Sequence, residues 1–307
     1  MSALFTFPGQ GAQKPGMLHR LPAHPAVRAT LDEATDVLGR GLAALDSEHA
    51  LQTTEAVQLS LLIAGTAAAR LLAARGAEPA MVCGLSVGAF PAAVTAGALD
   101  FADALRLVAL RGQLMERAYP RGYGMTAILG LAPAALEPVL AGLRERGLPV
   151  YLANINSESQ LVIAGSDEAM AAAAAQAHAL GARHGERLRI AVPSHCPLLE
   201  RPAAEFARAF EGVAIRRPRL TYLSSSLARP LFEPARIAAD LAGNMASLVR
   251  WRDSARLAWE RGARLAVEMP PGHTLTRLCA ETFGNGCAAF EATPVDTLVA
   301  LIASAAE

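Results

Sequence analysis

The segment AMVCGLSVGAF, Ala80–Phe90, runs from an apolar stretch directly into a serine that lies between two glycines. The apolar stretch is typical of a short buried strand, and the chain from Val87 onward has helical character. A Gly-x-Ser-x-Gly turn between a strand and a helix is tight, and it projects the serine oxygen away from the sheet. The first N–H groups of the following helix can stabilise an oxyanion. The segment therefore predicts a nucleophile at Ser86, and the alternative is a helix start with small residues for close packing.

Buried strands and helices alternate along much of the chain, which is typical of an α/β fold. Its 307 residues suffice for one large domain with an insertion or for two domains. Strands are expected at residues 4–7, 80–84, 220–226 and 263–269, and helices at residues 26–39, 54–75, 237–245 and 252–260, with further helices from about 87, 100 and 274.

A different order of elements occupies residues 123–192. Strands are expected at 124–131, 149–156, 160–166 and 186–192, with helices at 132–147 and 167–185. The order β-α-β-β-α-β is that of a ferredoxin-like unit. We therefore expect a large domain formed by residues 1–122 and 193–307, with a small ferredoxin-like domain, residues 123–192, inserted into it.

The composition excludes several classes of function. Basic and acidic residues number 28 each, and without a basic surface we expect no nucleic acid partner. The most apolar run, Ala56–Ala69, is shorter than the roughly 20 residues that span a bilayer, so no membrane segment is expected. The start MSALFTFPGQ lacks the regions of a signal peptide, which favours a cytoplasmic location. The four cysteines and seven histidines show no metal-ligand spacing, so we expect no metal.

A serine nucleophile needs a base at neutral pH, and two histidines are candidates. His195 lies in VPSHCPLLE, where the inserted unit returns to the large domain. His273 lies in EMPPGHTLT, at a second strand-to-helix turn. From the residues alone, His195 is either the base or a histidine that begins a helix.

Several segments together carry a family resemblance. In order and spacing, FPGQGAQ, GLSVGAF, LVALRGQLM, NIN…QLVIAG, VPSHCPLL and EMPPGHTLTRL resemble malonyl-CoA:acyl-carrier-protein transacylases, from about Phe5 to about Leu278. The resemblance implies an α/β-hydrolase-like large domain with a parallel sheet core and an inserted ferredoxin-like small domain. This agrees with the order of elements read from the residues.

The same resemblance implies roles in acyl transfer. Ser86 corresponds to the nucleophile that becomes malonylated, and His195 to its base. The backbone N–H groups of Gln10 and Val87 correspond to the oxyanion hole.

Three further residues correspond to substrate-binding positions. Arg111 corresponds to the arginine that grips the free carboxylate of the malonyl group; otherwise it is a solvated arginine on an amphipathic helix. Gln58 corresponds to a glutamine near the nucleophile, where its role is binding or only structural. Asn244 stands where the family usually has glutamine, whose main-chain carbonyl orients the histidine, so we expect a mild effect of this change.

The reaction implied is a two-step transfer. His195 removes the Ser86 proton, and the serine oxygen attacks the malonyl thioester of malonyl-CoA. The malonyl group then passes to the phosphopantetheine-type thiol of an acyl carrier protein. The CoA thioester is a substrate, and no bound cofactor is expected.

Two departures from the family pattern indicate which member of the family the chain resembles most. Leu85 precedes the nucleophile where the family usually has histidine, and Pro270-Pro271-Gly272 replaces Gly-Pro-Gly. With the opening LFTFPGQGAQKPGML, these departures resemble the malonate decarboxylase epsilon subunit, which loads the acyl carrier subunit of the decarboxylase. We favour that acceptor, and the alternative is the transacylase of fatty-acid synthesis.

Two other classes of function stay open. A serine hydrolase would use Ser86 with His273 and an acid such as Asp253, in the order of α/β-hydrolases. A carrier-docking module without catalysis is the non-enzymatic alternative, to which Leu85 points.

Overall fold

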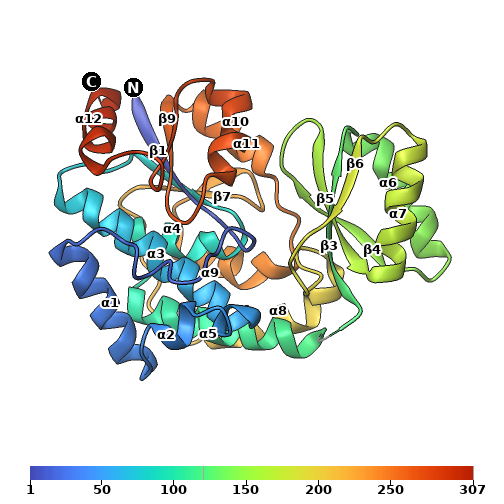
Figure 1. Cartoon of the computed structure of the whole chain (residues 1–307), viewed down its shortest axis with the longest axis horizontal. Coiled ribbons are helices and arrows are strands. Elements are labelled where there is room, and N and C mark those ends of the chain that lie inside the picture. The colour runs from blue at the N-terminus through green and yellow to red at the C-terminus, as the bar shows by residue number, and fades with distance from the viewer. Residues whose placement is uncertain (120, 307) are drawn as a thin grey trace.

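The computed structural model describes residues 1–119 and 121–306. The molecule has a large part built on a six-stranded sheet and a smaller part built on a four-stranded sheet (Figure 1). Both ends of the chain lie on the large part, close to each other (Figure 1). The α/β class is confirmed, with a parallel core and a separate antiparallel sheet.

The large sheet has the strand order β10-β9-β1-β2-β7-β8. Its strands are β1 (Ser2–Phe7), β2 (Met81–Gly84), β7 (Thr221–Ser224), β8 (Arg229–Leu231), β9 (Ala263–Glu268) and β10 (Cys287–Ala289). The pairs from β10 to β7 are parallel, and β8 pairs antiparallel with β7 at the edge. Strands β8 and β10 were not predicted, because three residues are too few to show an alternating pattern.

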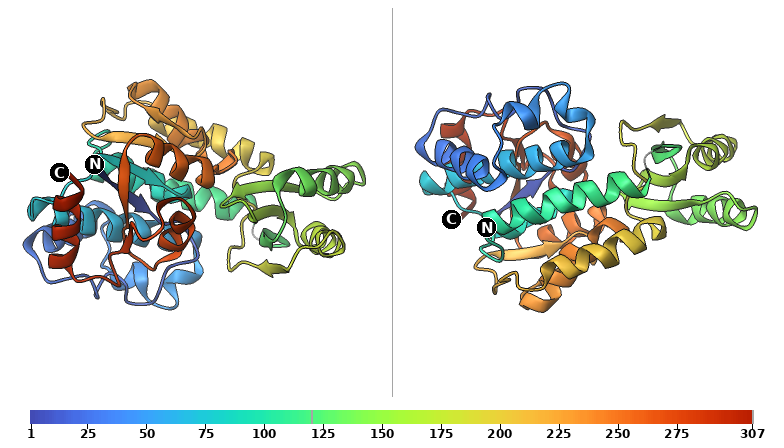
Figure 2. Two further views of the ribbon diagram at one scale, coloured as in Figure 1. Left: turned by 90° about the horizontal axis from the view of Figure 1, so that it is seen from above. Right: turned by 90° about the horizontal axis from the view of Figure 1, so that it is seen from below.

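Helices cover both faces of this sheet (Figure 2). They are α1 (Pro25–Leu38), α2 (Ala43–Asp46), α3 (Thr54–Ala74), α4 (Ala89–Thr95), α5 (Phe101–Ala118), α8 (Glu200–Ala207), α9 (Pro234–Gly243), α10 (Trp251–Glu260), α11 (Thr274–Phe283) and α12 (Val295–Ala306). Successive strand residues point to opposite faces. Phe5 and Phe7 therefore pack into the core that includes α3 and α5, whereas Leu4 packs into a second core with Trp251 and Leu275.

Helix α3 lies in the centre of the larger core. It has 21 residues and extends beyond the apolar run Ala56–Ala69 at both ends, so the length of that run alone does not exclude a spanning helix. By length and composition α3 could cross a membrane, but 89% of its most apolar stretch is buried inside the protein. A buried core helix can have the same length and composition, and burial on nearly all sides explains why α3 is apolar around its whole circumference.

The small part contains the predicted β-α-β-β-α-β unit. Its elements are β3 (Tyr123–Leu129), α6 (Pro133–Glu145), β4 (Val150–Ile155), β5 (Gln160–Ser166), α7 (Asp167–Ala179) and β6 (His184–Arg187). The strands are antiparallel in the order β4-β5-β3-β6. The domain limits at 122/123 and 192/193 stay a prediction.

The two faces of the small sheet have different neighbours. Ile128 and Ile163 pack with α6 and α7 on one face. Met125 and Val162 lie on the other face, which is turned toward the large part. The edge strand β4 is tied to the large part, because the N–H of Ile155 donates to the carbonyl of Val249 at 2.8 Å.

Strand β6 differs from its prediction. The expected strand at residues 186–192 is instead His184–Arg187, which pairs with β3. The alternating apolar residues that follow do not continue the strand. Leu188 and Ile190 pack against the inner face of the small sheet as the chain returns to the large part.

We expect the turn after β2 to tolerate no side chain at Gly88. A Cβ there would overlap the carbonyl oxygen of Phe7, a backbone atom that already accepts the N–H of Leu85 at 2.9 Å. Gly88→Ala should therefore lower the free energy of unfolding by at least about 2 kcal/mol, measured by urea denaturation. Gly142→Ala is the control, because Gly142 lies within α6 with no neighbour near its Cβ position. This control should stabilise the protein by about 0.5–1 kcal/mol, and equal effects at both glycines would contradict the packing argument.

Candidate active site

Ser86 lies on the sharp turn that the sequence predicts. Strand β2 ends at Gly84, and a short 3-10 helical turn, Ser86–Gly88, leads into α4. Ser86 has a φ of +57°, in the left-handed region that residues with a side chain rarely adopt. A Cβ at Gly84 would overlap the backbone of Gly88, so the turn can close only around glycine. This strained turn holds the Ser86 side chain at the carboxyl end of β2.

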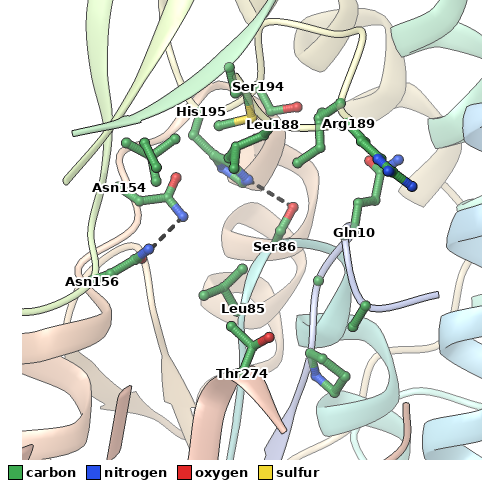
Figure 3. Close-up of a pocket in the computed structure, with 18 of the residues that line it drawn as sticks. Gln10, Leu85, Ser86, Asn154, Asn156, Leu188, Arg189, Ser194, His195 and Thr274 are labelled. Carbon is green, nitrogen blue, oxygen red and sulfur yellow. Dashed lines mark hydrogen bonds between the residues drawn. The ribbon is translucent and has the colours of Figure 1, made fainter. Parts of the chain in front are cut away.

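His195 faces Ser86 from the segment that follows the small part. Its Nε2 lies 2.7 Å from the Ser86 Oγ (Figure 3). His195 also has a positive φ, +64°, and is only 2% exposed. Two strained residues from distant parts of the chain thus meet in one hydrogen bond.

The other ring nitrogen of His195 fixes the tautomer. Nδ1 lies 3.0 Å from the carbonyl oxygen of Asn244 and 3.1 Å from that of Ser247. Carbonyl oxygens only accept hydrogen bonds, so Nδ1 carries the proton and Nε2 is free to accept the Ser86 hydroxyl. Burial and the nearby Arg111 cation lower the pKa of His195 to about 4, so the ring is neutral at neutral pH.

The Arg111 side chain extends from α5 toward Ser86 and His195. It is 0% exposed, and burial lowers its pKa to about 9, so it remains a cation at neutral pH. Its Nη1 donates to Gln58 Oε1 at 2.6 Å, and its Nη2 donates to Asn244 Oδ1 at 3.1 Å. Nη2 also lies 3.4 Å from the Ser86 Oγ. The structure therefore brings Arg111, Gln58 and Asn244 together at the nucleophile.

The acceptors around Arg111 are all neutral. Among the ion pairs of residues 1–119 and 121–306, none includes Arg111. Its Nε has no hydrogen-bond partner within the same described part of the chain. A buried cation without a counter-ion is costly, and the cost falls when an anion binds. An anionic group bound beside Ser86 would supply that counter-ion.

Gln10 lies beside Ser86, in the turn that follows β1. The turn after β1 packs so closely that a Cβ at Gly9 would lie 3.3 Å from the Cβ of Ser86. The Gln10 Oε1 accepts a hydrogen bond from Gln58 Nε2 at 3.2 Å. Val87 follows Ser86 on the helical turn, as a residue of an oxyanion hole must. The oxyanion role of Gln10 and Val87 stays a prediction.

A cavity of about 530 Å³ opens above Ser86, between the two parts of the molecule (Figure 3). The large part contributes Gln10, Leu85 and Thr274 to its wall. The small part contributes Met125 and Asn154. Ser86 and His195 thus lie at the junction of the two sheets, where a long substrate has room to enter.

The comparisons with known proteins agree with this geometry. Residues 4–302 match the family model described as acyl transferase domain. The chain belongs to the acyl transferase domain family. It is 36% identical over 280 residues to the malonyl CoA-acyl carrier protein transacylase of Escherichia coli (strain K12), covering 89% of this chain and 90% of that protein.

Solved structures extend the similarity to the whole fold. The malonyl CoA-acyl carrier protein transacylase of Coxiella burnetii superposes with a TM-score of 0.93 at 32% identity, covering 100% of this chain and 98% of the other. A malonyl-transacylase, PlMCAT, in complex with AntF, a type II PKS acyl-carrier protein, superposes with a TM-score of 0.91 at 33% identity, covering 99% and 100%.

The site of this acyl transferase has what an acyl transfer needs. The Ser86 hydroxyl is hydrogen-bonded to a neutral base, so its proton can pass to His195 Nε2 as the oxygen attacks an acyl carbon. The imidazolium can return the proton to a leaving thiolate. The carbonyls of Asn244 and Ser247 keep the ring in one orientation throughout.

The geometry does not favour the hydrolase arrangement. His273 is exposed at the start of α11, and the Ser86 Oγ hydrogen-bonds with His195 and Arg111. Asp253 lies on α10 and pairs with Arg252 at 2.9 Å. Within the described part of the chain, no cluster of three or more His, Cys, Asp or Glu side chains could hold a metal ion.

Several residues of this site were not predicted from the sequence. Asn154 and Asn156 line the cavity and hydrogen-bond to each other at 3.4 Å (Figure 3). Both lie in the NIN motif, so a signal was present, but only the structure shows that they face the cavity. The carbonyl of Ser247 was missed as well, because main-chain acceptors leave no trace in a sequence.

We expect acylation of Ser86 to remain constant as the pH falls through 6.5 and to decline only as the pH approaches about 4. A histidine can accept a proton only when it is neutral, and the lowered pKa keeps His195 neutral over that range. The measurement is the single-turnover rate of Ser86 acylation by a reactive ester against pH, with circular dichroism to confirm folding. His195→Ala should lower the rate at least about a hundredfold, whereas His273→Ala should retain the rate and the profile. A decline centred near 6.5 would show that the base is not this buried histidine.

Proposed function

We propose that the chain transfers a malonyl group from malonyl-CoA to the phosphopantetheine-type thiol of an acyl carrier protein. The observation that carries the proposal is the buried, uncompensated Arg111 guanidinium 3.4 Å from the Ser86 Oγ. A malonyl group esterified to Ser86 has a free carboxylate that one methylene group separates from the acyl carbon. That carboxylate reaches the guanidinium and supplies the missing negative charge.

The relatives support the same substrate class. The similar proteins of Escherichia coli and Coxiella burnetii are named malonyl CoA-acyl carrier protein transacylases. The PlMCAT structure holds a carrier protein together with its transacylase. The cavity of about 530 Å³ above Ser86 offers room for the arm that carries the thioester.

The transfer takes two steps. Ser86 Oγ loses its proton to His195 Nε2 and attacks the thioester carbonyl, and the carbon–sulfur bond then breaks as the CoA sulfur takes a proton from His195. The carrier thiol next enters, loses its proton to His195, and attacks the ester carbonyl of malonyl-Ser86. The ester bond breaks, and Ser86 regains its proton from His195. In both steps we assign the oxyanion to the N–H groups of Gln10 and Val87.

Selectivity tests the role of Arg111. Malonyl-CoA and acetyl-CoA share the thioester and the CoA, so only the distal carboxylate distinguishes them. An arginine forms two parallel charge-assisted bonds to a carboxylate, each contributing roughly 1.5–3 kcal/mol. Arg111→Ala should lower kcat/KM for malonyl-CoA by at least about a hundredfold and leave kcat/KM for acetyl-CoA unchanged or improved. Arg111→Lys should recover part of the loss, because one ammonium group cannot form both bonds.

The control for that experiment is Ser86→Ala, which should abolish transfer from both thioesters and leave no malonyl adduct in the intact mass. Equal losses for the two thioesters in Arg111→Ala would mean that Arg111 supports the fold or binds the CoA, and the malonyl proposal would fail.

For the acceptor we propose the acyl carrier subunit of malonate decarboxylase. The support is the sequence alone, through Leu85 and Pro270-Pro271-Gly272. In the structure Leu85 lines the cavity and packs on the core that contains Trp251, so an apolar residue suits this position. The names of the similar transacylases fit the alternative, the carrier of fatty-acid synthesis, and none of them names a decarboxylase.

A direct comparison of the two carriers decides between them. With malonyl-CoA as donor, the decarboxylase carrier subunit should show a kcat/KM at least about tenfold above that of the fatty-acid carrier. The malonyl-Ser86 enzyme is formed before the carrier enters, so its rate of formation is the internal control. A preference for the fatty-acid carrier would replace the acceptor proposed here and leave the malonyl transfer intact.

A further inference from the structure

Asn244 contacts both the base and the substrate-binding arginine. It lies directly after α9 and is 1% exposed. Its main-chain carbonyl lies 3.0 Å from His195 Nδ1, and its side-chain Oδ1 accepts from Arg111 Nη2 at 3.1 Å. One residue thus offers a different oxygen to each of the two groups.

The two contacts are separable. His195 is also held by the Ser247 carbonyl at 3.1 Å from Nδ1, and its own N–H donates to the Met245 carbonyl at 2.7 Å. These three hydrogen bonds of His195 are all accepted by main-chain carbonyls, which a substitution at Asn244 retains. Within the described part of the chain, the Asn244 side chain hydrogen-bonds to Arg111 alone.

We propose that Asn244 is a positioning residue for acyl selectivity, which holds the Nη2 side of Arg111 without neutralising its charge. This inference rests on the proposed malonyl transfer. A guanidinium has five N–H donors in a rigid plane, and two anchors are enough to fix that plane. Gln58 fixes Nη1 and Asn244 fixes Nη2, and the N–H groups that remain are available to a carboxylate on Ser86.

The neutrality of the Asn244 side chain is the decisive property. Aspartate has the same shape, and at this position its carboxylate would lie within hydrogen-bond distance of Nη2. A charge-assisted bond between them would make a buried ion pair inside the site. The substrate carboxylate would then have to compete with an internal carboxylate, whereas an acetyl group would be unaffected by that competition.

The experiment compares Asn244→Asp, Asn244→Ala and Asn244→Gln by the ratio of kcat/KM for malonyl-CoA to that for acetyl-CoA. Asn244→Asp should lower the ratio at least about tenfold, with most of the loss in the KM for malonyl-CoA, because it forfeits a charge-assisted bond. Asn244→Ala should lower the ratio by a smaller factor, since Arg111 keeps its charge but loses an anchor. Asn244→Gln should keep the ratio within about threefold of the wild type, because it retains a neutral amide oxygen.

The ratio separates positioning from a structural role. A partial loss of folding lowers the amount of active protein for both thioesters equally, so it cancels in the ratio. Asn285→Asp is the matched control, because it makes the same change at an exposed residue of the turn after α11. It should leave kcat/KM unchanged for both malonyl-CoA and acetyl-CoA. If Asn244→Asp does not fold, the ratio in Asn244→Ala decides the question.

Two outcomes overturn different proposals. An unchanged ratio in Asn244→Asp and Asn244→Ala, together with a collapsed ratio in Arg111→Ala, would show that Arg111 needs no anchor at Asn244. An unchanged ratio in Arg111→Ala would instead remove the malonyl proposal itself.

Discussion

Arg111 carries a positive charge in the interior of the protein, and the arrangement of the site depends on how that charge is held. The close approach of two helices places it there. A Cβ at Gly112 would overlap the backbone of Glu55, so α5 can contact α3 directly at this point. Arg111 then reaches Gln58 on α3 with a 2.6 Å bond. Neutral acceptors stabilise the guanidinium, but they leave its charge available to a ligand, and burial strengthens its attraction for an anion by removing water.

The positions of the Ser86 Oγ and the His195 Nε2 depend on a strained backbone as well as on packing. Ser86 and His195 both adopt positive φ values, which cost of order 1–3 kcal/mol each and persist only where the surroundings fix them. At Ser86 the surroundings are the backbones of Gly84 and Gly88. At His195 they are the carbonyls of the turn that begins at Asn244. The same turn is joined to strand β4 of the small sheet through Val249, so the base is fixed where the two parts of the molecule meet.

Much of this arrangement could be predicted from the sequence. The strand before Ser86 and the order of elements in the small part are strong local patterns, and the structure has both. The edge strand β8 and the limits of β6 were not predictable, because strand pairing and the path back to the large part are set by tertiary contacts. At the site, motifs indicated Arg111 and His195, but a motif does not reveal that Arg111 has no acidic partner among the described residues. The expectation of a mild effect at Asn244 considered only its carbonyl, and the side-chain contact with Arg111 became visible only in three dimensions.

The positive charge of Arg111 also explains why main-chain carbonyls, and not a carboxylate, hold the His195 ring. In a Ser-His-Asp triad, a carboxylate orients the histidine and stabilises the imidazolium. Here two main-chain carbonyls orient the ring without adding negative charge. A carboxylate at position 244 would lie beside Arg111 and neutralise its charge. With carbonyl acceptors in place of a carboxylate, Arg111 stays available to an anionic ligand, and His195 is a weaker base than the histidine of a triad. The pKa of His195 is lowered by burial and by Arg111, and a malonyl carboxylate bound to Arg111 offsets the second of these effects. If Arg111 binds the malonyl carboxylate as proposed, a malonyl substrate raises the pKa of His195 and makes it a stronger base, whereas an acetyl group leaves the repulsion between Arg111 and the imidazolium in place.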